Sequence, residues 1–149
     1  MANDGTMPLD VAAILPVSGE RRSRWAGAEI ATILVVEDDP DIRALAVESL
    51  ALIGYRVLSA ADGVAALALL ESSAAIDLLF SDIVMPGGLS GTELARCARR
   101  LRPEIKVVLT SGYAQHPAAE PALESEIDAF LAKPYRPRAL AAQLEAVLG

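Results

Sequence analysis

The sequence predicts an α/β fold, a doubly wound parallel sheet in a single domain, from three observations. The chain has 149 residues and is 53% hydrophobic, which is enough for one sizeable core. Five short apolar or β-branched segments alternate with helical patterns, at residues 32–36, 56–60, 76–81, 105–109 and 129–132. Most are apolar at consecutive positions, as parallel strands buried on both faces are. Such alternation forms parallel sheets with right-handed crossovers.

The first two helices follow from their terminal residues. Asp39 is a suitable N-cap, Pro40 fits the first helical position, and Gly54 suits the C-terminal cap. A helical stripe broken only by one serine defines the expected inward face: Ile42, Leu45, Ala46, Ser49, Leu50 and Ile53. Asp62 and Gly63 open a second helix that is expected to run to about residue 72.

Two later helices are also well marked. Ser90 and Glu93 form a capping box for the third helix, and Pro103 follows its end. Its expected inward residues are Leu94, Ala95, Ala98 and Leu101. The last helix is expected at residues 137–148, with Leu140, Leu144, Val147 and Leu148 inward.

Two segments fit the pattern poorly. Residues 1–30 have no clear period and are predicted to be a mostly disordered leader to a domain at 31–149. The fourth helix falls in residues 113–126, where Pro117 and Pro121 limit it to about two turns. We expect that segment to be the most mobile part of the domain, because it buries little apolar surface.

The candidate functional residues share one edge of the predicted sheet. Five strands of this kind most often adopt the flavodoxin-like (βα)5 order 2-1-3-4-5, with a switch point between strands one and three. Glu37 and Asp38 end strand one, and Asp82 ends strand three. Thr110 and Lys133 end strands four and five. Ligands bind outside the carboxyl ends of such strands, so this edge is the predicted site.

These residue types suit a divalent cation and a phosphoryl group. Mg²⁺ prefers oxygen ligands and is usually held by one or two carboxylates, here Asp38 and Asp82. Glu37 is long enough to act through a water, and the backbone carbonyl of Val84 is a further candidate ligand. A carboxylate is also able to take a phosphoryl group as an aspartyl phosphate.

Positive charge and a hydroxyl would assist that transfer. Phosphoryl transfer depends on positioning and on neutralised oxygens, which Mg²⁺ and the Lys133 ammonium would provide. The Thr110 hydroxyl would donate a hydrogen bond to a phosphoryl oxygen. Each residue alone has an ordinary explanation as a strand-end or surface residue. Their conjunction at one edge favours a functional site.

Other residues are given ordinary structural roles. Asp39 is interpreted as a helix cap only, His116 as an exposed loop residue, and Cys97 as a small residue on the third helix. The arginines of that helix are interpreted as a solvated face: Arg96, Arg99, Arg100 and Arg102.

Composition excludes several classes of protein. The net charge of −7 argues against nonspecific nucleic-acid binding. No apolar run reaches the roughly 18 residues of a membrane span. One cysteine rules out an internal disulfide and fits a reducing cytoplasm, which is the expected location.

Four motifs together resemble the response-regulator receiver domain of bacterial two-component signalling. They are I-L-V-V-E-D-D-P at 33–40, S-D-I-V-M-P-G-G at 81–88, V-L-T-S-G-Y at 108–113 and A-K-P-Y at 132–135. The resemblance implies that a histidine kinase or histidine phosphotransfer protein phosphorylates Asp82. It implies that Glu37 and Asp38 bind Mg²⁺, and that the Lys133–Pro134 peptide bond is cis. It also implies a switch formed by Thr110 and Phe130.

The resemblance carries expectations about output. The segment Met85-Pro86-Gly87-Gly88 in the third strand–helix loop has one more glycine than the shorter family loop. The Ser-Gly-Tyr and Lys-Pro-Tyr variants resemble receivers that stand alone or are attached to hybrid histidine kinases. The last predicted helix ends near Gly149, so readout is expected through a downstream protein partner rather than DNA or membrane contact. Such a module catalyses only its own phosphorylation and dephosphorylation.

Two alternatives belong to other functional classes. One is a small Mg²⁺-dependent phosphatase or phosphotransferase that uses Asp82 as nucleophile. Phosphatases of the haloacid dehalogenase type usually have a second aspartate two residues on, where this chain has Val84. The other is a flavodoxin-like binding module. It would need a phosphate-cradling loop in place of the acidic residues at 37–39.

Overall fold

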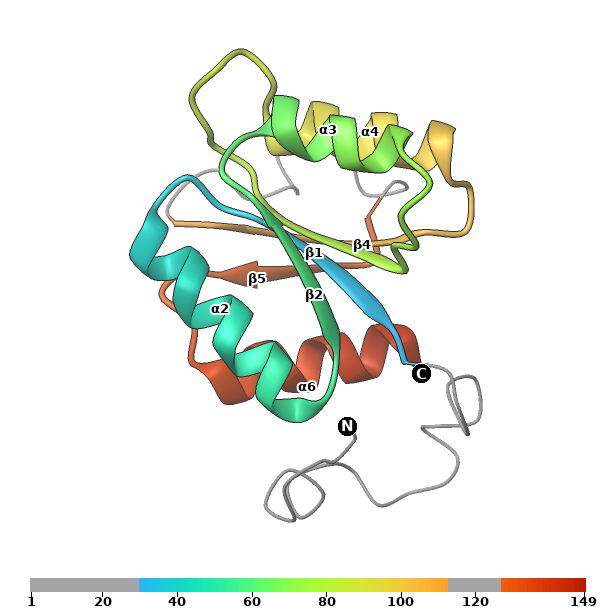
Figure 1. The fold of residues 1–149 in the computed structure, drawn as a ribbon. Coiled ribbons are helices and arrows are strands. Elements are labelled where there is room, and N and C mark those ends of the chain that lie inside the picture. The colour runs from blue at the N-terminus through green and yellow to red at the C-terminus, as the bar shows by residue number, and fades with distance from the viewer. Residues whose placement is uncertain (1–29, 113–126) are drawn as a thin grey trace.

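The computed structural model describes residues 30–112 and 127–149 and contains a five-stranded parallel sheet (Figure 1). The strand order is β2-β1-β3-β4-β5, which confirms the predicted order. The strands are β1 (Thr32–Val36), β2 (Arg56–Ala60), β3 (Leu78–Asp82), β4 (Lys106–Ser111) and β5 (Ala129–Ala132).

Four helices of the described residues cover the two faces of the sheet. They are α2 (Pro40–Ile53), α3 (Gly63–Glu71), α4 (Gly91–Leu101) and α6 (Pro137–Leu148). In Figure 1, α2 and α6 lie on one face, and α3 and α4 lie on the other. The predicted leader, apart from its last residue, and the predicted fourth helix lie outside the described residues.

The predicted helix caps are present. The Asp39 side chain accepts hydrogen bonds from the backbone N–H groups of Asp41 and Ile42, at 2.8 and 3.2 Å. Gly54 ends α2 with a φ of 116°, a left-handed conformation that favours glycine. Ser90 and Glu93 form the capping box of α4. These local bonds satisfy backbone groups at the start of α2 and α4 that have no partner within the helix.

The core consists of two layers separated by the sheet. Alternate residues of β1 point to opposite faces, so Leu34 packs toward α3 and α4 while Ile33 packs toward α2 and α6. Leu79 and Phe80 of β3 divide in the same way. Burying a side chain of this size contributes about 1.5 to 3 kcal/mol to the stability of the fold. Helices on both faces of the sheet are needed to bury both sets of side chains.

Several element boundaries and helix faces differ from the prediction. Strand β3 begins at Leu78 rather than at residue 76, and β4 extends to Ser111. Leu45 is 50% exposed and Leu101 is 45% exposed, although both were expected to face inward. Each lies at the margin of its apolar stripe. Each helix contacts the core along a stripe narrower than the predicted one, through Leu50 in α2 and Leu94 in α4.

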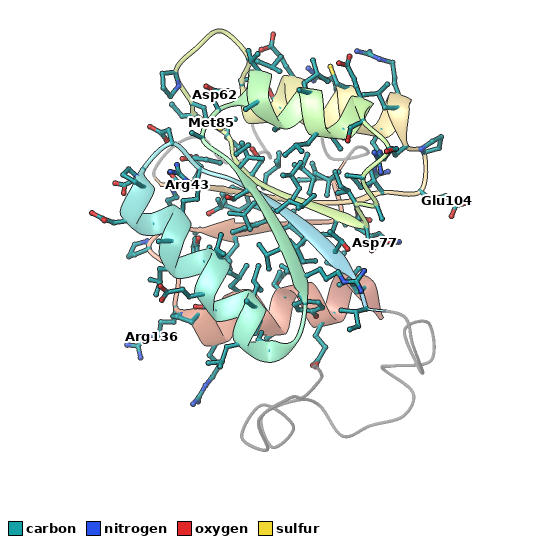
Figure 2. The ribbon with its side chains drawn as sticks, viewed as in Figure 1. Arg43, Asp62, Asp77, Met85, Glu104 and Arg136 are labelled. Carbon is teal, nitrogen blue, oxygen red and sulfur yellow. The ribbon has the colours of Figure 1, made fainter. Side chains whose placement is uncertain are left out.

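The two ends of the sheet have different roles. Figure 2 shows Asp77 and Glu104 at the opposite end of the strands from Arg43 and Met85. The Asp77 carboxylate accepts a hydrogen bond from the Thr32 N–H at 2.7 Å and so secures the start of β1. The Asp77 carboxylate therefore has a structural role at that end of the sheet. The predicted site residues lie at the carboxyl end of the strands.

Candidate metal and phosphoryl site

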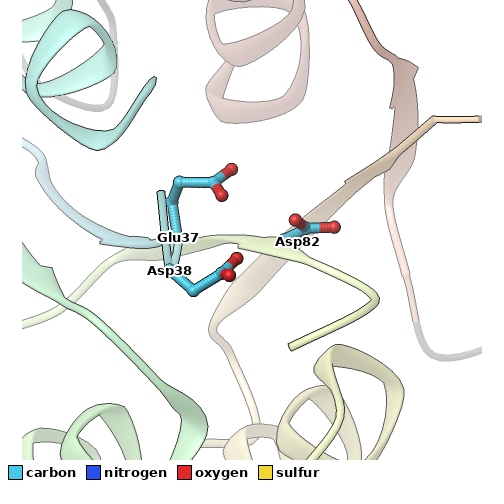
Figure 3. Close-up of side chains that lie close together, drawn as sticks. All are labelled: Glu37, Asp38 and Asp82. Carbon is cyan, nitrogen blue, oxygen red and sulfur yellow. The ribbon is translucent and has the colours of Figure 1, made fainter. Parts of the chain in front are cut away.

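Three carboxylates meet beyond the carboxyl ends of β1 and β3. Glu37 and Asp38 directly follow β1, and Asp82 is the last residue of β3, its neighbour in the sheet. Each of the three offers an oxygen, and these oxygens all lie within 4.8 Å of one another. In Figure 3, the Glu37 and Asp38 side chains extend from the end of β1 toward Asp82. The parallel sheet thus brings together residues far apart in the sequence.

The three carboxylates differ in how firmly the protein holds them. Glu37 is 4% exposed and Asp82 is 7% exposed, whereas Asp38 is exposed. The Glu37 carboxylate accepts a hydrogen bond from the Asp39 N–H at 3.1 Å. The Glu37 N–H donates to the carbonyl of Ala60 in β2 at 3.2 Å. Glu37 is therefore fixed by its surroundings, while the Asp38 carboxylate faces solvent.

Lys133, the residue after β5, forms ion pairs with two of these groups. Its Nζ lies 2.8 Å from Glu37 Oε1 and 2.9 Å from Asp82 Oδ2. Burial works against the Lys133 ammonium, but its hydrogen bonds to the two carboxylates outweigh burial and raise its pKa. Burial raises the pKa of Glu37, although the hydrogen bonds from Lys133 and Asp39 lower it. Because two buried carboxylates share one ammonium, this part of the site has an excess of negative charge.

Thr110 brings a hydroxyl without a partner to the same place. It lies inside β4, directly opposite Asp82 in the β3–β4 register. Its Oγ1 is buried and has no hydrogen-bond partner among the described residues. An unsatisfied buried hydroxyl costs about 1 to 3 kcal/mol and calls for an explanation. A ligand oxygen at Asp82 would supply the missing acceptor.

The remaining predicted residues lie around this cluster. The Val84 N–H donates to Asp82 Oδ1 at 3.2 Å, and the Val84 side chain is exposed. Its carbonyl as a metal ligand stays a prediction. Phe130 is half-buried in β5 and packs against the core layer of α3 and α4. It pairs with Leu109, the residue before Thr110. The Lys133–Pro134 peptide bond is cis, as the resemblance implied.

Two further residues belong to the surroundings of the site. Arg43 Nη1 donates to the backbone carbonyl of Glu37 at 2.8 Å, a contact the sequence reasoning did not foresee. The feature of the sequence that could have predicted this contact is a basic residue one turn into the helix that follows the acidic loop. Tyr135 packs edge-to-face on Phe80 with ring centroids 5.7 Å apart. Burial, followed by the charge of Glu37, raises the pKa of Tyr135 to about 12.

The residues present fit a hard divalent cation. All the side-chain ligand atoms that the cluster offers are carboxylate oxygens, the ligand type that Mg²⁺ prefers. Crowded carboxylates repel one another unless a cation is present. The exposed Asp38 gives such an ion an open approach from solvent.

We expect Thr110→Val to stabilise the metal-free protein by about 1 to 2 kcal/mol, because it removes a buried hydroxyl that has no partner. Urea unfolding of both proteins in the presence of a chelator measures this difference. Thr92→Val is the control. The Thr92 hydroxyl lies 2.9 Å from Ser90 Oγ, so its removal should lower stability. A destabilised Thr110→Val protein would show that Oγ1 already has a partner.

The raised pKa of Glu37 predicts a pH dependence of stability. The folded state binds a proton at Glu37 more tightly than the unfolded state, whose pKa is near 4.5. Stability from this group therefore falls as pH rises from 4.5 through the folded-state pKa. We expect Glu37→Gln to gain stability over the wild type across that window and to keep the gain above it. Chelator-treated urea titrations at several pH values measure it. A difference that does not change with pH would contradict the prediction.

None of the helices in the described part of the chain is long and apolar enough to span a membrane.

Comparisons with known proteins identify the family to which the chain is similar. The family model described as "Response regulator receiver domain" matches residues 33–145. Response regulator receiver protein CpdR of Brucella abortus is 37% identical over 117 residues, 78% of this chain and 95% of that protein. Sensor kinase CckA of the same organism is 37% identical over 119 residues, which are 79% of this chain but only 12% of the kinase.

Solved structures give the same result. A CheY-like response regulator receiver domain protein from Methanospirillum hungatei superposes with a TM-score of 0.73 at 34% sequence identity. The match covers 80% of this chain and 94% of that one.

Proposed function

The chain belongs to the response regulator receiver family, and from this premise we propose that it accepts a phosphoryl group on Asp82 from a histidine kinase or histidine phosphotransfer protein. The observation that carries the assignment is the set of contacts around Asp82. Its carboxylate lies within 2.9 Å of the Lys133 ammonium, beside Glu37 and Asp38 and opposite Thr110. Relatives of this chain include both kinases and response regulators of two-component systems.

Each residue has a role in the transfer. An Asp82 oxygen attacks the phosphorus, and the bond from phosphorus to the donor nitrogen or oxygen breaks with its electron pair leaving on the donor. Lys133 offsets the charge of the phosphoryl oxygens, and the Thr110 hydroxyl donates a hydrogen bond to one of them. Glu37, Asp38, Asp82 and the Val84 carbonyl would hold Mg²⁺, which supplies charge neutralisation when bound.

The phosphoryl group would reach a partner surface through β4 and β5. Thr110 pairs in register with Leu131, the residue after Phe130. A Thr110 hydroxyl drawn toward the phosphoryl group would shift a pre-existing two-state equilibrium that includes Phe130. We place the downstream contact around β5 and the start of α6, near Tyr135 and Arg136. Arg136 is exposed at the start of α6 (Figure 2). The segment 113–126, where the fourth helix was predicted, lies outside the described residues.

The wider assignment remains part of this proposal. The receiver domain is placed at residues 31–149, after a leader at 1–30, and acts in the cytoplasm, which its single cysteine supports. It signals by protein contact without binding DNA and catalyses only its own phosphorylation and dephosphorylation. The phosphatase alternative is not favoured, because the matching family is a signalling one and Val84 stands where a second acid would be needed.

Mg²⁺-dependent phosphorylation tests the proposal. We expect the wild-type protein to gain one acid-stable, base-labile phosphate from acetyl phosphate only when Mg²⁺ is present. Asp38→Ala should need at least about 10-fold more Mg²⁺ for half-maximal labelling, because it removes the most accessible ligand. Asp41→Ala removes an exposed carboxylate of the same type three residues away and should label normally. Mass spectrometry gives both results. Equal Mg²⁺ midpoints for wild type and Asp38→Ala would refute the ligand assignment.

A further inference from the structure

We infer that Arg43 is a positioning residue for the Mg²⁺ site, acting through the backbone that carries Asp38. The inference rests on the proposed function, since it assumes that the three carboxylates hold the ion. Its basis is the hydrogen bond from Arg43 Nη1 to the Glu37 carbonyl, at 2.8 Å. Arg43 is half-buried near the start of α2, above the end of β1 (Figure 2).

The Glu37 carbonyl lies just beyond the strand ladder. The register of β1 with both of its neighbours ends at Val36. The Glu37 N–H still donates a hydrogen bond to the Ala60 carbonyl in β2. The Glu37 carbonyl, however, accepts its hydrogen bond from Arg43 rather than from a neighbouring strand. A peptide unit is planar, so a bond to this carbonyl holds the whole unit that joins Glu37 to Asp38. Arg43 therefore fixes the direction in which the chain leaves the sheet.

Asp38 depends on that direction more than its neighbours do. Among the described residues, Lys133 holds both the Glu37 and the Asp82 carboxylates. Within residues 30–112 and 127–149, no hydrogen bond or ion pair holds the exposed Asp38 carboxylate, so its placement follows from its backbone. Rotation of the Glu37–Asp38 peptide unit would carry this ligand away from Asp82. The protein thus positions its most accessible metal ligand through a backbone contact.

The anchor for this contact is rigid. Arg43 is helical, and its own N–H donates to the Asp39 carbonyl at 2.9 Å. The helix begins with Pro40 and is capped by the Asp39 side chain. The acidic loop at residues 37–39 is therefore restrained by the helix, by its N-cap and by the Arg43 side chain. A guanidinium suits this task because it is planar and keeps its charge at all relevant pH values.

Mg²⁺ binding to the unphosphorylated protein tests the inference. Titration calorimetry should show Mg²⁺ affinity reduced about 10-fold in Arg43→Met, the size typical of losing a group that orients a metal ligand. Arg43→Lys keeps a charged donor of similar reach and should recover most of the affinity. Arg56→Met, which removes an exposed arginine at the far end of β2, should bind as the wild type does.

A second readout separates positioning from charge. In the metal-free state, Arg43→Met should shift the backbone amide resonances of Asp38 and Asp39, and the affinity loss should persist at 0.5 M salt, on the order of a 4 Å screening length. Unchanged affinity in Arg43→Met would overturn the inference. So would a loss that high salt abolishes without any amide shift, because it would mean that Arg43 acts by charge alone. Absence of Mg²⁺ binding in the wild type would instead defeat the proposed function.

Discussion

Asp82→Asn is expected to abolish the phosphodonor-dependent mass gain while leaving the fold intact. A carboxamide has the shape of the carboxylate but lacks its nucleophilic oxygen. The asparagine oxygen can still accept the hydrogen bond that the Val84 N–H now donates to Asp82. The Lys133 ammonium keeps its bond to Glu37 at 2.8 Å. The substitution therefore removes the phosphoryl acceptor and the ion pair of residue 82 with Lys133, and leaves the other contacts of the site in place.

Intact-mass spectrometry after incubation with acetyl phosphate and Mg²⁺ measures the effect. Asp41→Asn is the matched control, since it makes the same change at an exposed position outside the carboxylate cluster. Thermal unfolding of both variants should show that their folds survive. Undiminished labelling of Asp82→Asn would mean that another side chain takes the phosphoryl group.

Lys133→Met should produce the largest change in stability. It leaves Glu37 and Asp82, both buried, side by side without their shared cation. Breaking a buried ion pair by removing one partner costs about 3 to 5 kcal/mol. Because the Lys133 side chain is 19% exposed, we expect a loss of about 2 to 4 kcal/mol in the metal-free protein.

The direction of the Lys133 pKa shift determines the pH at which the stability of Lys133→Met should be measured. Its pKa is raised in the folded state, so its stabilisation is complete below 10.5 and is lost only as pH rises through the folded value. Measurements near pH 7 therefore report the full effect. Urea unfolding with a chelator measures it, and Lys106→Met, a lysine change at the start of β4, is the control. Equal losses for the two variants would show that the ion pairs contribute nothing.

Lys133→Met should also separate metal binding from signalling. The ammonium and Mg²⁺ would compete for the same carboxylates, so the variant should bind Mg²⁺ at least as tightly as the wild type and regain much of its stability on binding. Beryllofluoride, a mimic of the phosphoryl group, should change amide exchange in β4 and β5 of the wild type, and this change should be lost in Lys133→Met. A variant that still shows the wild-type change would mean that Lys133 does not couple the site to β5.

The order of the elements, and the edge of the sheet that carries the site, could be predicted from the amino-acid sequence alone. Buried parallel strands have a strong apolar signal, and the caps at Asp39, Gly54 and Ser90 depend on bonds a few residues away. Strand order then places Glu37, Asp38 and Asp82 at one edge, because parallel strands end on the same side. These features are local, or follow from connectivity, and so can be predicted from one chain.

The pairing of the side chains at that edge could be seen only in the folded protein. Lys133 lies 96 residues from Glu37 in the chain, yet it binds both Glu37 and Asp82. The unpartnered Thr110 hydroxyl, the Arg43 contact and the exposure of Leu45 likewise depend on packing between distant elements. Periodicity shows which face of a strand or helix is apolar. Distances of about 3 Å between charged groups depend on the exact register and depth of several elements together, which no local pattern contains.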